Sequence, residues 1–271
     1  MKKLLICGLG SIGQRHVRQI KKLTNGTMQL GALRLRNQKI VINDKLEGIK
    51  GKTPEEQYKL KLFTEVEAAI EWHPDIVFIT NPISMHIDTA IVAAKAGGNI
   101  FIEKPLDCST KRLDELENLV EKKNLTCMIG YQLRYHPGYK KVRELVLEGH
   151  LGKITYADLH FGEWLPGMHP YEDYRISHAA KKDQGGGVIF CLSHKIDLAY
   201  WIFGFPFSVY AVGGKLSELE MDVEDSVDIL FEYKNNNFNF PLHIHLDFIQ
   251  RKKKCFINVV GEKGSVFFDY C

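Results

Sequence analysis

The first thirteen residues constrain the fold more than any other stretch of the chain. An apolar run, Lys3 to Cys7, leads directly into the pattern Gly8-Leu9-Gly10-Ser11-Ile12-Gly13. Apolar residues and His16 then recur at helical spacing as far as Leu23, which predicts an amphipathic helix. The order strand, glycine turn, helix is typical of a unit that binds a dinucleotide.

Each glycine of this turn has an expected task. Gly8 would permit the tight turn, Gly10 would let the backbone approach a pyrophosphate, and Gly13 would let the helix pack closely on the strand. The helix start at Ser11 and Ile12 would offer free N–H groups and a positive dipole to the phosphates. A glycine turn that binds no nucleotide remains the alternative.

The next strand, predicted over 28–35, bears on the choice of cofactor. An acid near its end would hold the ribose 2′-hydroxyl of NAD, but Arg34 and Arg36 stand there instead. Because an arginine can pair with a 2′-phosphate, we expect NADP in preference to NAD. The alternative is that both arginines are solvated charges at a strand end.

Strands and helices then alternate as far as residue 131. Strands are predicted over 75–80, 99–102 and 126–131, and helices over 86–96 and 110–123. This alternation predicts a doubly wound parallel sheet, in which ligands lie at the carboxyl ends of the strands. The residues expected at that edge are Thr80, Asn81, Pro82, Glu103 and Lys104.

Composition excludes several classes of function. The 271 residues suffice for two domains, and the net charge of +3 is too small and too dispersed to indicate nucleic-acid binding. Six cysteines without a C-x-x-C pair indicate reduced thiols, so we expect a cytoplasmic protein. The N-terminal apolar run is too short for a signal peptide, and no run is long enough to span a membrane.

An unusual apolar stretch near the middle of the second half, residues 184–204, contains three glycines, His194 and Asp197. On one continuous helix, Cys191, His194 and Asp197 would share a side. The stretch could be a buried structural helix, a metal site of these three residues or a catalytic helix. The spacing lacks the usual pairing of ligands, so we expect no metal.

Several motifs together resemble the Gfo/Idh/MocA oxidoreductase family, named after glucose–fructose oxidoreductase and inositol dehydrogenase. These are GLGSIGQRH, TNP with His86 after it, EKP, GYQLRYHP (130–137), GGGVIFCLSHKID and VVGEKGSVFFDY (259–270). The resemblance implies an α/β chain with a Rossmann domain, assigned to residues 1–128. It also implies a C-terminal α+β domain with a large, mostly antiparallel open sheet, assigned to residues 129–271. Strand patterns over 227–233, 242–249 and 255–260 agree with this second domain.

The resemblance also implies the chemistry: hydride transfer between NAD or NADP and a sugar, polyol or nucleotide-sugar hydroxyl carbon. Lys104 matches the family's active-site lysine, whose following proline is often cis, and His194 matches its catalytic histidine. Histidine suits the base, and a lysine can stabilise the developing alkoxide. The family also implies a homodimer or homotetramer built through the C-terminal sheet.

The residues expected in the site follow from these arguments. Asp197, Arg134 and Trp164 are expected on the substrate side. The residues expected to contact the cofactor are Gly8, Gly10, Ser11, Ile12, Gly13, Arg34, Arg36, Thr80, Asn81, Pro82, His86, Glu103, Lys104 and Gln132.

Two departures from the family pattern keep a second function open. Family members often carry an aspartate three or four residues before the catalytic histidine, where Cys191 and Phe190 stand here. The sequence also stops just after a predicted strand, where relatives usually continue, so we expect either a truncated chain or a shortened sheet. The alternative function is a non-catalytic NADP-binding sensor or partner subunit.

Overall fold

The computed structural model describes residues 1–34 and 40–271, so the predicted cofactor residue Arg36 lies outside the described residues. The chain forms two compact units. The first holds residues 1–130, 170–172 and 183–185, and the second holds residues 131–169, 173–182 and 186–271. Two short segments from the second half of the sequence therefore belong to the first unit.

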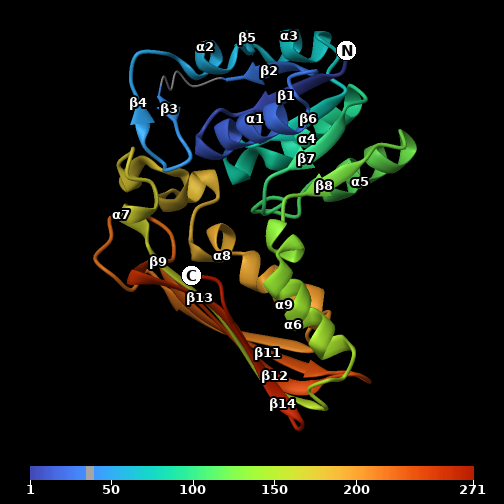
Figure 1. Cartoon of the computed structure of the whole chain (residues 1–271), viewed down its shortest axis with the longest axis vertical. Helices are drawn as coiled ribbons and strands as arrows, with labels where there is room; N and C mark the ends of the chain where they lie inside the picture. Colours follow the sequence, from blue (N-terminus) through green and yellow to red (C-terminus); the bar gives the residue numbers. More distant parts are fainter. Residues whose placement is uncertain (35–39) are drawn as a thin grey trace. The chain divides into compact units, whose positions relative to one another are not determined.

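The first unit is built on a parallel sheet in the order β5-β2-β1-β6-β7-β8 (Figure 1). The strands are β1 (Lys3–Cys7), β2 (Gln29–Leu33), β5 (Lys61–Phe63), β6 (Ile76–Ile79), β7 (Asn99–Ile102) and β8 (Cys127–Ile129). Its helices are α1 (Ser11–Leu23), α2 (Pro54–Tyr58), α3 (Val66–Glu71), α4 (His86–Lys95) and α5 (Leu113–Lys122), and a hairpin of β3 (Val41–Ile42) and β4 (Gly48–Ile49) precedes α2. This is the doubly wound order expected from the sequence.

Both faces of this sheet are buried, as the apolar run of β1 predicts. Leu4 and Ile6 pack with Val17 of α1, whereas Leu5 and Cys7 belong to the core that includes α4. Successive strand residues point to opposite faces, so a continuous apolar strand requires a layer of helices on each side.

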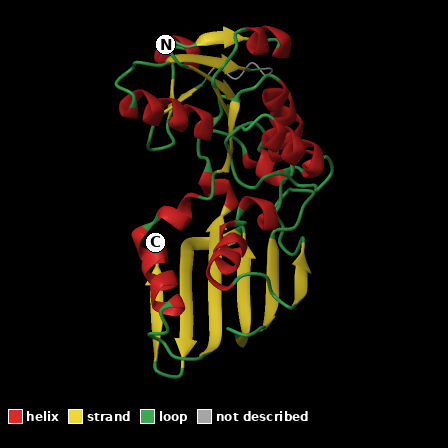
Figure 2. Cartoon of the chain, turned by 90° about the vertical axis from the view of Figure 1, so that its right-hand side faces the viewer, coloured by secondary structure: helices red, strands yellow, loops and turns green. Residues whose placement is uncertain are grey.

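The second unit contains a large sheet, whose strands are yellow in Figure 2. Its six strands lie in the order β10-β11-β12-β9-β13-β14. The strands are β9 (Ile154–Trp164), β10 (Ser208–Gly214), β11 (Ser226–Lys234), β12 (Asn239–Asp247), β13 (Ile249–Gly261) and β14 (Gly264–Asp269). Only β12 and β9 pair in parallel, so the sheet is mostly antiparallel as expected. Its helices are α6 (Pro137–Leu147), α7 (Leu165–Met168), α8 (Val188–Cys191) and α9 (His194–Phe203), and the short 3-10 helix η2 (Gln132–Tyr135) precedes α6.

This sheet has one apolar and one polar face. Leu242, Ile244 and Leu246 of β12 are fully buried, and α9 supplies Leu198 and Ile202 to the same core. The intervening β12 residues, His243 and His245, face the other way. Alternation of this kind fits a sheet covered by helices on one side only.

The glycine-rich stretch differs from the single helix assumed in the sequence analysis. Helix α8 ends at Cys191, a turn follows at residues 192–193, and α9 begins at His194. Leu192 has φ −102° and ψ 20°, which is outside helical geometry. The prediction that Cys191, His194 and Asp197 share one side of a continuous helix is therefore wrong, and only His194 and Asp197 lie on the same helix.

Membrane insertion through a helix finds no support in the described part of the chain. None of the helices in residues 1–34 and 40–271 is long and apolar enough to cross a membrane.

Candidate active site

The glycine turn has the geometry that dinucleotide binding requires. Gly8 has φ 104°, and a Cβ there would lie 2.8 Å from the backbone oxygen of Thr80. A Cβ on Gly13 would lie 2.2 Å from the backbone oxygen of Gly8, so both positions exclude a side chain. A Cβ on Gly10 would meet nothing within 4 Å, which leaves that backbone open to a ligand. Contact of these residues with a cofactor stays a prediction.

The start of α1 favours an anion. The helix has thirteen residues, its N-cap is Gly10, and its first turn contains Ser11 and Ile12 but no acid. Thr80, at the end of β6, braces the turn because its hydroxyl donates to the backbone oxygen of Gly8 at 2.7 Å. The helix N-terminus can therefore present N–H groups to phosphate without a competing carboxylate.

His86 joins the two loops that follow β6 and β7. It is almost fully buried, with Nδ1 2.9 Å from the backbone oxygen of Pro105 and Nε2 3.0 Å from that of Asn81. Burial lowers the pKa of His86, against the effect of its two carbonyl contacts. Its position connects the Asn81-Pro82 segment to the loop of Lys104, and the Lys104–Pro105 peptide bond is cis as the resemblance implied.

Glu103 anchors the same loop to α1. Its Oε1 lies 2.7 Å from Nε2 of His16, and its Oε2 accepts the backbone N–H of Lys104 at 3.2 Å. The His16 ring makes edge contacts with Phe78 and Phe101, at centroid distances of 5.2 Å. Glu103 therefore links the backbone of Lys104 to the His16 side chain of α1.

Arg34 follows β2 directly, but it does not lie open to solvent. Its Nη2 is 2.7 Å from Oε1 of Glu55, and its side chain is only 9% exposed. Glu55 lies on α2, beyond the hairpin of β3 and β4. The structure therefore places an acid beside the end of β2, where the sequence near residue 34 contains none.

The second unit brings η2 and the start of α9 together. Arg134 forms a two-point ion pair with Asp197, from Nε to Oδ2 at 2.9 Å and from Nη2 to Oδ1 at 2.5 Å. Gln132 Nε2 lies 3.5 Å from Nε2 of His194, and the Tyr131 ring lies edge-on to the histidine. Asp197 and Arg134, both expected on the substrate side, pair with each other and hold Gln132 beside His194.

The charges in this cluster are partly buried. His194 is 7% exposed and the Asp197 side chain 6%, whereas the Arg134 side chain is 33% exposed. Burial raises the pKa of Asp197, and the Arg134 guanidinium opposes that shift. One end of the ion pair, the arginine that is one-third exposed, is therefore open to solvent, whereas the carboxylate is buried.

Trp164, the third residue expected on the substrate side, has its indole ring in contact with Arg251. The guanidinium carbon of Arg251 lies 3.4 Å from the centre of its indole ring. This is a close cation–π contact between β9 and β13. Contact of Trp164 with a substrate stays a prediction.

Sequence reasoning missed three residues near these sites. Glu55 pairs with Arg34 from 21 positions away. Glu224 reaches the start of α8, where its Oε1 accepts the backbone N–H of Ile189 at 3.2 Å and where a Cβ on Gly187 would collide with it. Tyr171 belongs to the first unit, where burial raises its pKa to about 12 against a hydrogen bond with Ser11.

A histidine and aspartate cluster lies on the polar face of the second sheet. Ligand atoms of His160, His245 and Asp247 lie within 4.8 Å of one another. His245 bridges Asp228 at 2.8 Å and Asp247 at 3.0 Å, and Gln250 lies 2.6 Å from His160. These contacts raise the pKa of His245 to about 9. Contacts of His245 with two carboxylates, and of His160 with the Gln250 amide, hold these side chains close together.

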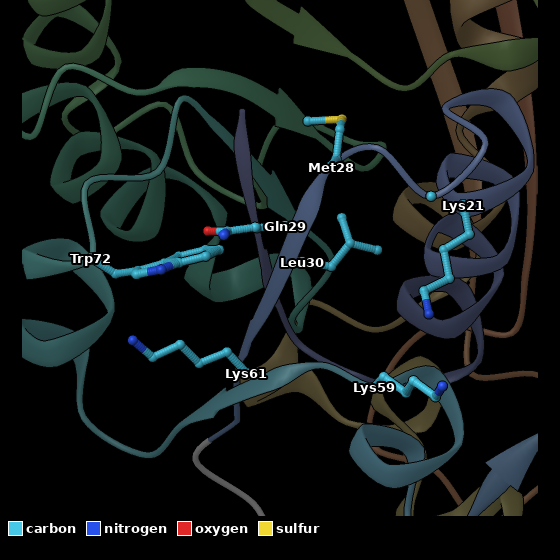
Figure 3. A pocket seen from close by; sticks show the side chains of 8 residues that line it. Lys21, Met28, Gln29, Leu30, Lys59, Lys61 and Trp72 are labelled. Atoms are coloured by element: carbon cyan, nitrogen blue, oxygen red, sulfur yellow. The ribbon is translucent and has the colours of Figure 1, made fainter. Parts of the chain in front are cut away.

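A groove in the first unit lies away from the glycine turn. It is lined by Lys21, Gly26, Met28, Gln29, Leu30, Lys59, Lys61 and Trp72 (Figure 3). Gln29 and Lys61 begin β2 and β5, so the groove lies at the amino ends of the strands. The glycine turn follows the carboxyl end of β1, at the opposite edge, so the groove is separate from the expected cofactor site.

Comparison with protein families agrees with the glycine turn and with the two units. The description "Oxidoreductase family, NAD-binding Rossmann fold" matches residues 2–131, and "GFO/IDH/MocA C-terminal domain" matches residues 139–267. The chain belongs to the Gfo/Idh/MocA family. Its N-terminal unit is of the NAD-binding Rossmann type, which confirms the expected class of cofactor.

Individual relatives have low sequence identity to this chain. Myo-inositol 2-dehydrogenase of Thermotoga maritima is 25% identical over 97% of this chain and 74% of its own length. The 2,7-anhydro-N-acetylneuraminate hydratase of Mediterraneibacter gnavus is 23% identical over 73% of this chain and 52% of its own. The crystal structure of the WlbA dehydrogenase from Bordetella pertussis, in complex with NADH and UDP-GlcNAcA, has a TM-score of 0.81 at 19% identity and covers 98% of this chain and 78% of that one. The chain spans about half the length of several curated relatives.

Proposed function

We propose that this chain is a nicotinamide-dependent oxidoreductase that transfers hydride to or from a hydroxyl-bearing carbon of a sugar, polyol or nucleotide sugar. Membership of the family supports the reaction class. Relatives named for inositol substrates and a solved dehydrogenase named with UDP-GlcNAcA support the substrate class.

The observation that carries the proposal within the chain is the placement of His194. It begins α9, beside the Gln132 amide, in a cluster braced by the ion pair of Arg134 and Asp197. A histidine oriented by neighbouring side chains is suited to take a hydroxyl proton. Lys104 follows β7 at the carboxyl edge of the parallel sheet, the edge where the nicotinamide cofactor is expected.

The roles follow from the charges that hydride transfer creates. When hydride leaves a carbinol carbon, the hydroxyl proton must leave with it, and His194 would accept that proton. The oxygen passes through partial alkoxide character, which the Lys104 ammonium would stabilise. In the reverse direction the same groups would protonate the carbonyl oxygen. The nicotinamide supplies or accepts the hydride.

Turnover of a panel of sugars, inositols and UDP-sugars, followed at 340 nm as NADH or NADPH appears, tests this proposal. Lys104→Ala and His194→Ala should each lower kcat/KM by at least about 100-fold, the usual contribution of an acid–base group. The matched controls are Lys111→Ala and His150→Ala, two exposed residues. Wild-type activity in both site variants would exclude these roles.

The second candidate is the non-catalytic binding subunit, which the replacement of the usual aspartate by Cys191 and Phe190 favours. It predicts NADH or NADPH binding without turnover of any panel member. Restoring the acid in Cys191→Asp tests this candidate further, because a gain of turnover would identify a degenerate active site.

We also propose that the polar face of the second sheet is where two copies associate. Tyr210 and Val212 of β10 and Leu230 of β11 are 46–69% exposed, and the strand register aligns Tyr210 with Leu230. Exposed apolar residues of this kind on a sheet face are typical of protein–protein contacts.

A further inference from the structure

The carboxyl end of β2 contains an ion pair that bears on cofactor choice. In a Rossmann unit this strand end is where the 2′ position of the adenosine ribose is recognised. Arg34 occupies that position, and its guanidinium is bound at 2.7 Å by Glu55. The arginine is therefore largely neutralised by a carboxylate before any cofactor arrives.

Glu55 is held on a well-defined local structure. Helix α2 begins with a capping box, in which the Thr53 hydroxyl accepts the backbone N–H of Glu56 and the Glu56 carboxylate accepts that of Thr53. Pro54 occupies the first helical turn, and Tyr58 is buried at its end. The Tyr58 hydroxyl accepts from Arg18 of α1 at 3.0 Å. These contacts fix the turn that carries Glu55 against the first unit.

The second oxygen of Glu55 is incompletely satisfied. Oε2 is buried and has no hydrogen-bond partner among the described residues, whereas Oε1 accepts from Arg34. A buried carboxylate oxygen without a donor costs free energy. A ribose hydroxyl that reaches this oxygen would satisfy it, whereas a 2′-phosphate would bring negative charge against negative charge.

We propose that Glu55 is the specificity-determining acid of the cofactor site and that the chain selects NAD(H) over NADP(H). The proposal rests on the proposed function, because it requires a dinucleotide at the glycine turn. It replaces the preference inferred from Arg34 and Arg36 alone. The acid comes from α2, beyond the hairpin, instead of from β2 itself.

Fluorescence titration of the full chain with NADH and with NADPH tests this proposal. The wild type should bind NADH at least about tenfold more tightly, which corresponds to about 1.4 kcal/mol. Glu55→Gln keeps the size of the side chain but removes its charge, so the ratio of the two dissociation constants should fall to about one or reverse. The Arg34 guanidinium would then no longer face the Glu55 carboxylate, and it could pair with the 2′-phosphate.

Glu56→Gln is the matched control. It removes the charge of a neighbouring carboxylate on the same helix, but that carboxylate accepts the backbone N–H of Thr53, so the ratio should stay at the wild-type value. A thermal melt of each variant establishes folding. If Glu55→Gln does not fold, the double variant Arg34→Met/Glu55→Gln removes both charges together and should show reduced discrimination.

The outcomes separate two failures. If no dinucleotide binds to the wild type, the proposed function fails. If NADH binds but NADPH binds equally or better, or if Glu55→Gln and the double variant both keep the wild-type ratio, the role of Glu55 is refuted and the proposed function stands.

Discussion

Removing Arg134 should destabilise the second unit far more than removing the charge of its partner Asp197. Loss of one member of a buried ion pair costs about 3–5 kcal/mol, because the other charge remains buried and unpaired. The Arg134 side chain is one-third exposed, and solvent screening reduces the expected cost of Arg134→Met to about 2–3 kcal/mol. In Asp197→Asn the remaining charge is the arginine, which water can reach, so we expect a loss of about 1 kcal/mol.

The cost of Arg134→Met should also depend on pH. Burial raises the pKa of Asp197, and loss of the guanidinium raises it further. A carboxyl with a folded-state pKa above its unfolded value destabilises the fold increasingly as the pH rises above about 3.9, its unfolded value. The difference between wild type and variant should therefore be largest at neutral pH and should shrink as the pH falls and Asp197 becomes protonated.

Urea unfolding followed by tryptophan fluorescence measures this effect. Trp164 and Trp201 lie in the second unit and Trp72 in the first, so a Trp72→Phe background reports on the second unit alone. Arg143→Met is the matched control, because Arg143 donates to the backbone oxygen of Trp201 and lies over its indole ring, and no ion pair joins it to a carboxylate among the described residues. Equal losses in Arg134→Met and Asp197→Asn, or a pH-independent loss in Arg134→Met, would refute the reasoning.

Two further predictions concern the polar face of the second sheet. Hydrogen bonds to Asp247 and Asp228 raise the pKa of His245 to about 9. The contribution of the protonated histidine to stability should therefore be complete below about pH 6.5 and should disappear as the pH rises through 9. Urea unfolding between about pH 6 and 10 should show this fall in the free energy of unfolding in the wild type and not in His245→Gln. Tyr210→Glu places a charge at a 69% exposed position of the proposed contact between copies, and sedimentation velocity should show a smaller species than the wild type. An unchanged sedimentation coefficient would exclude this surface.

Local patterns predicted much of the first unit. The strand expected over 99–102 has those bounds in β7, and the strand, glycine turn and helix at the N-terminus form as expected. Strand alternation, glycine geometry and helix stops depend on neighbours within a few residues, so the sequence pattern expresses them directly.

The sequence pattern did not predict which side chains pair when they are far apart in the chain. The sequence around Arg34 gives no sign that α2 places Glu55 beside it. Arg134 and Asp197 pair although they are 63 residues apart. The turn between α8 and α9 was also hidden, because the apolar residues on either side of residues 192–193 fit one helix as well as two. Partners chosen by packing cannot be deduced from spacing alone.

The segments 170–172 and 183–185 make the first unit discontinuous in sequence. Tyr171 hydrogen-bonds to Ser11 at the glycine turn, and a Cβ on Gly185 would lie 2.8 Å from Ile83. A gene fragment that encodes residues 1–130 alone would lack both pieces and would expose the surfaces that they cover. Residues 1–130 alone are therefore a poor choice for a chimera in which this Rossmann unit replaces that of a relative. Such an exchange would need to include the two distant segments.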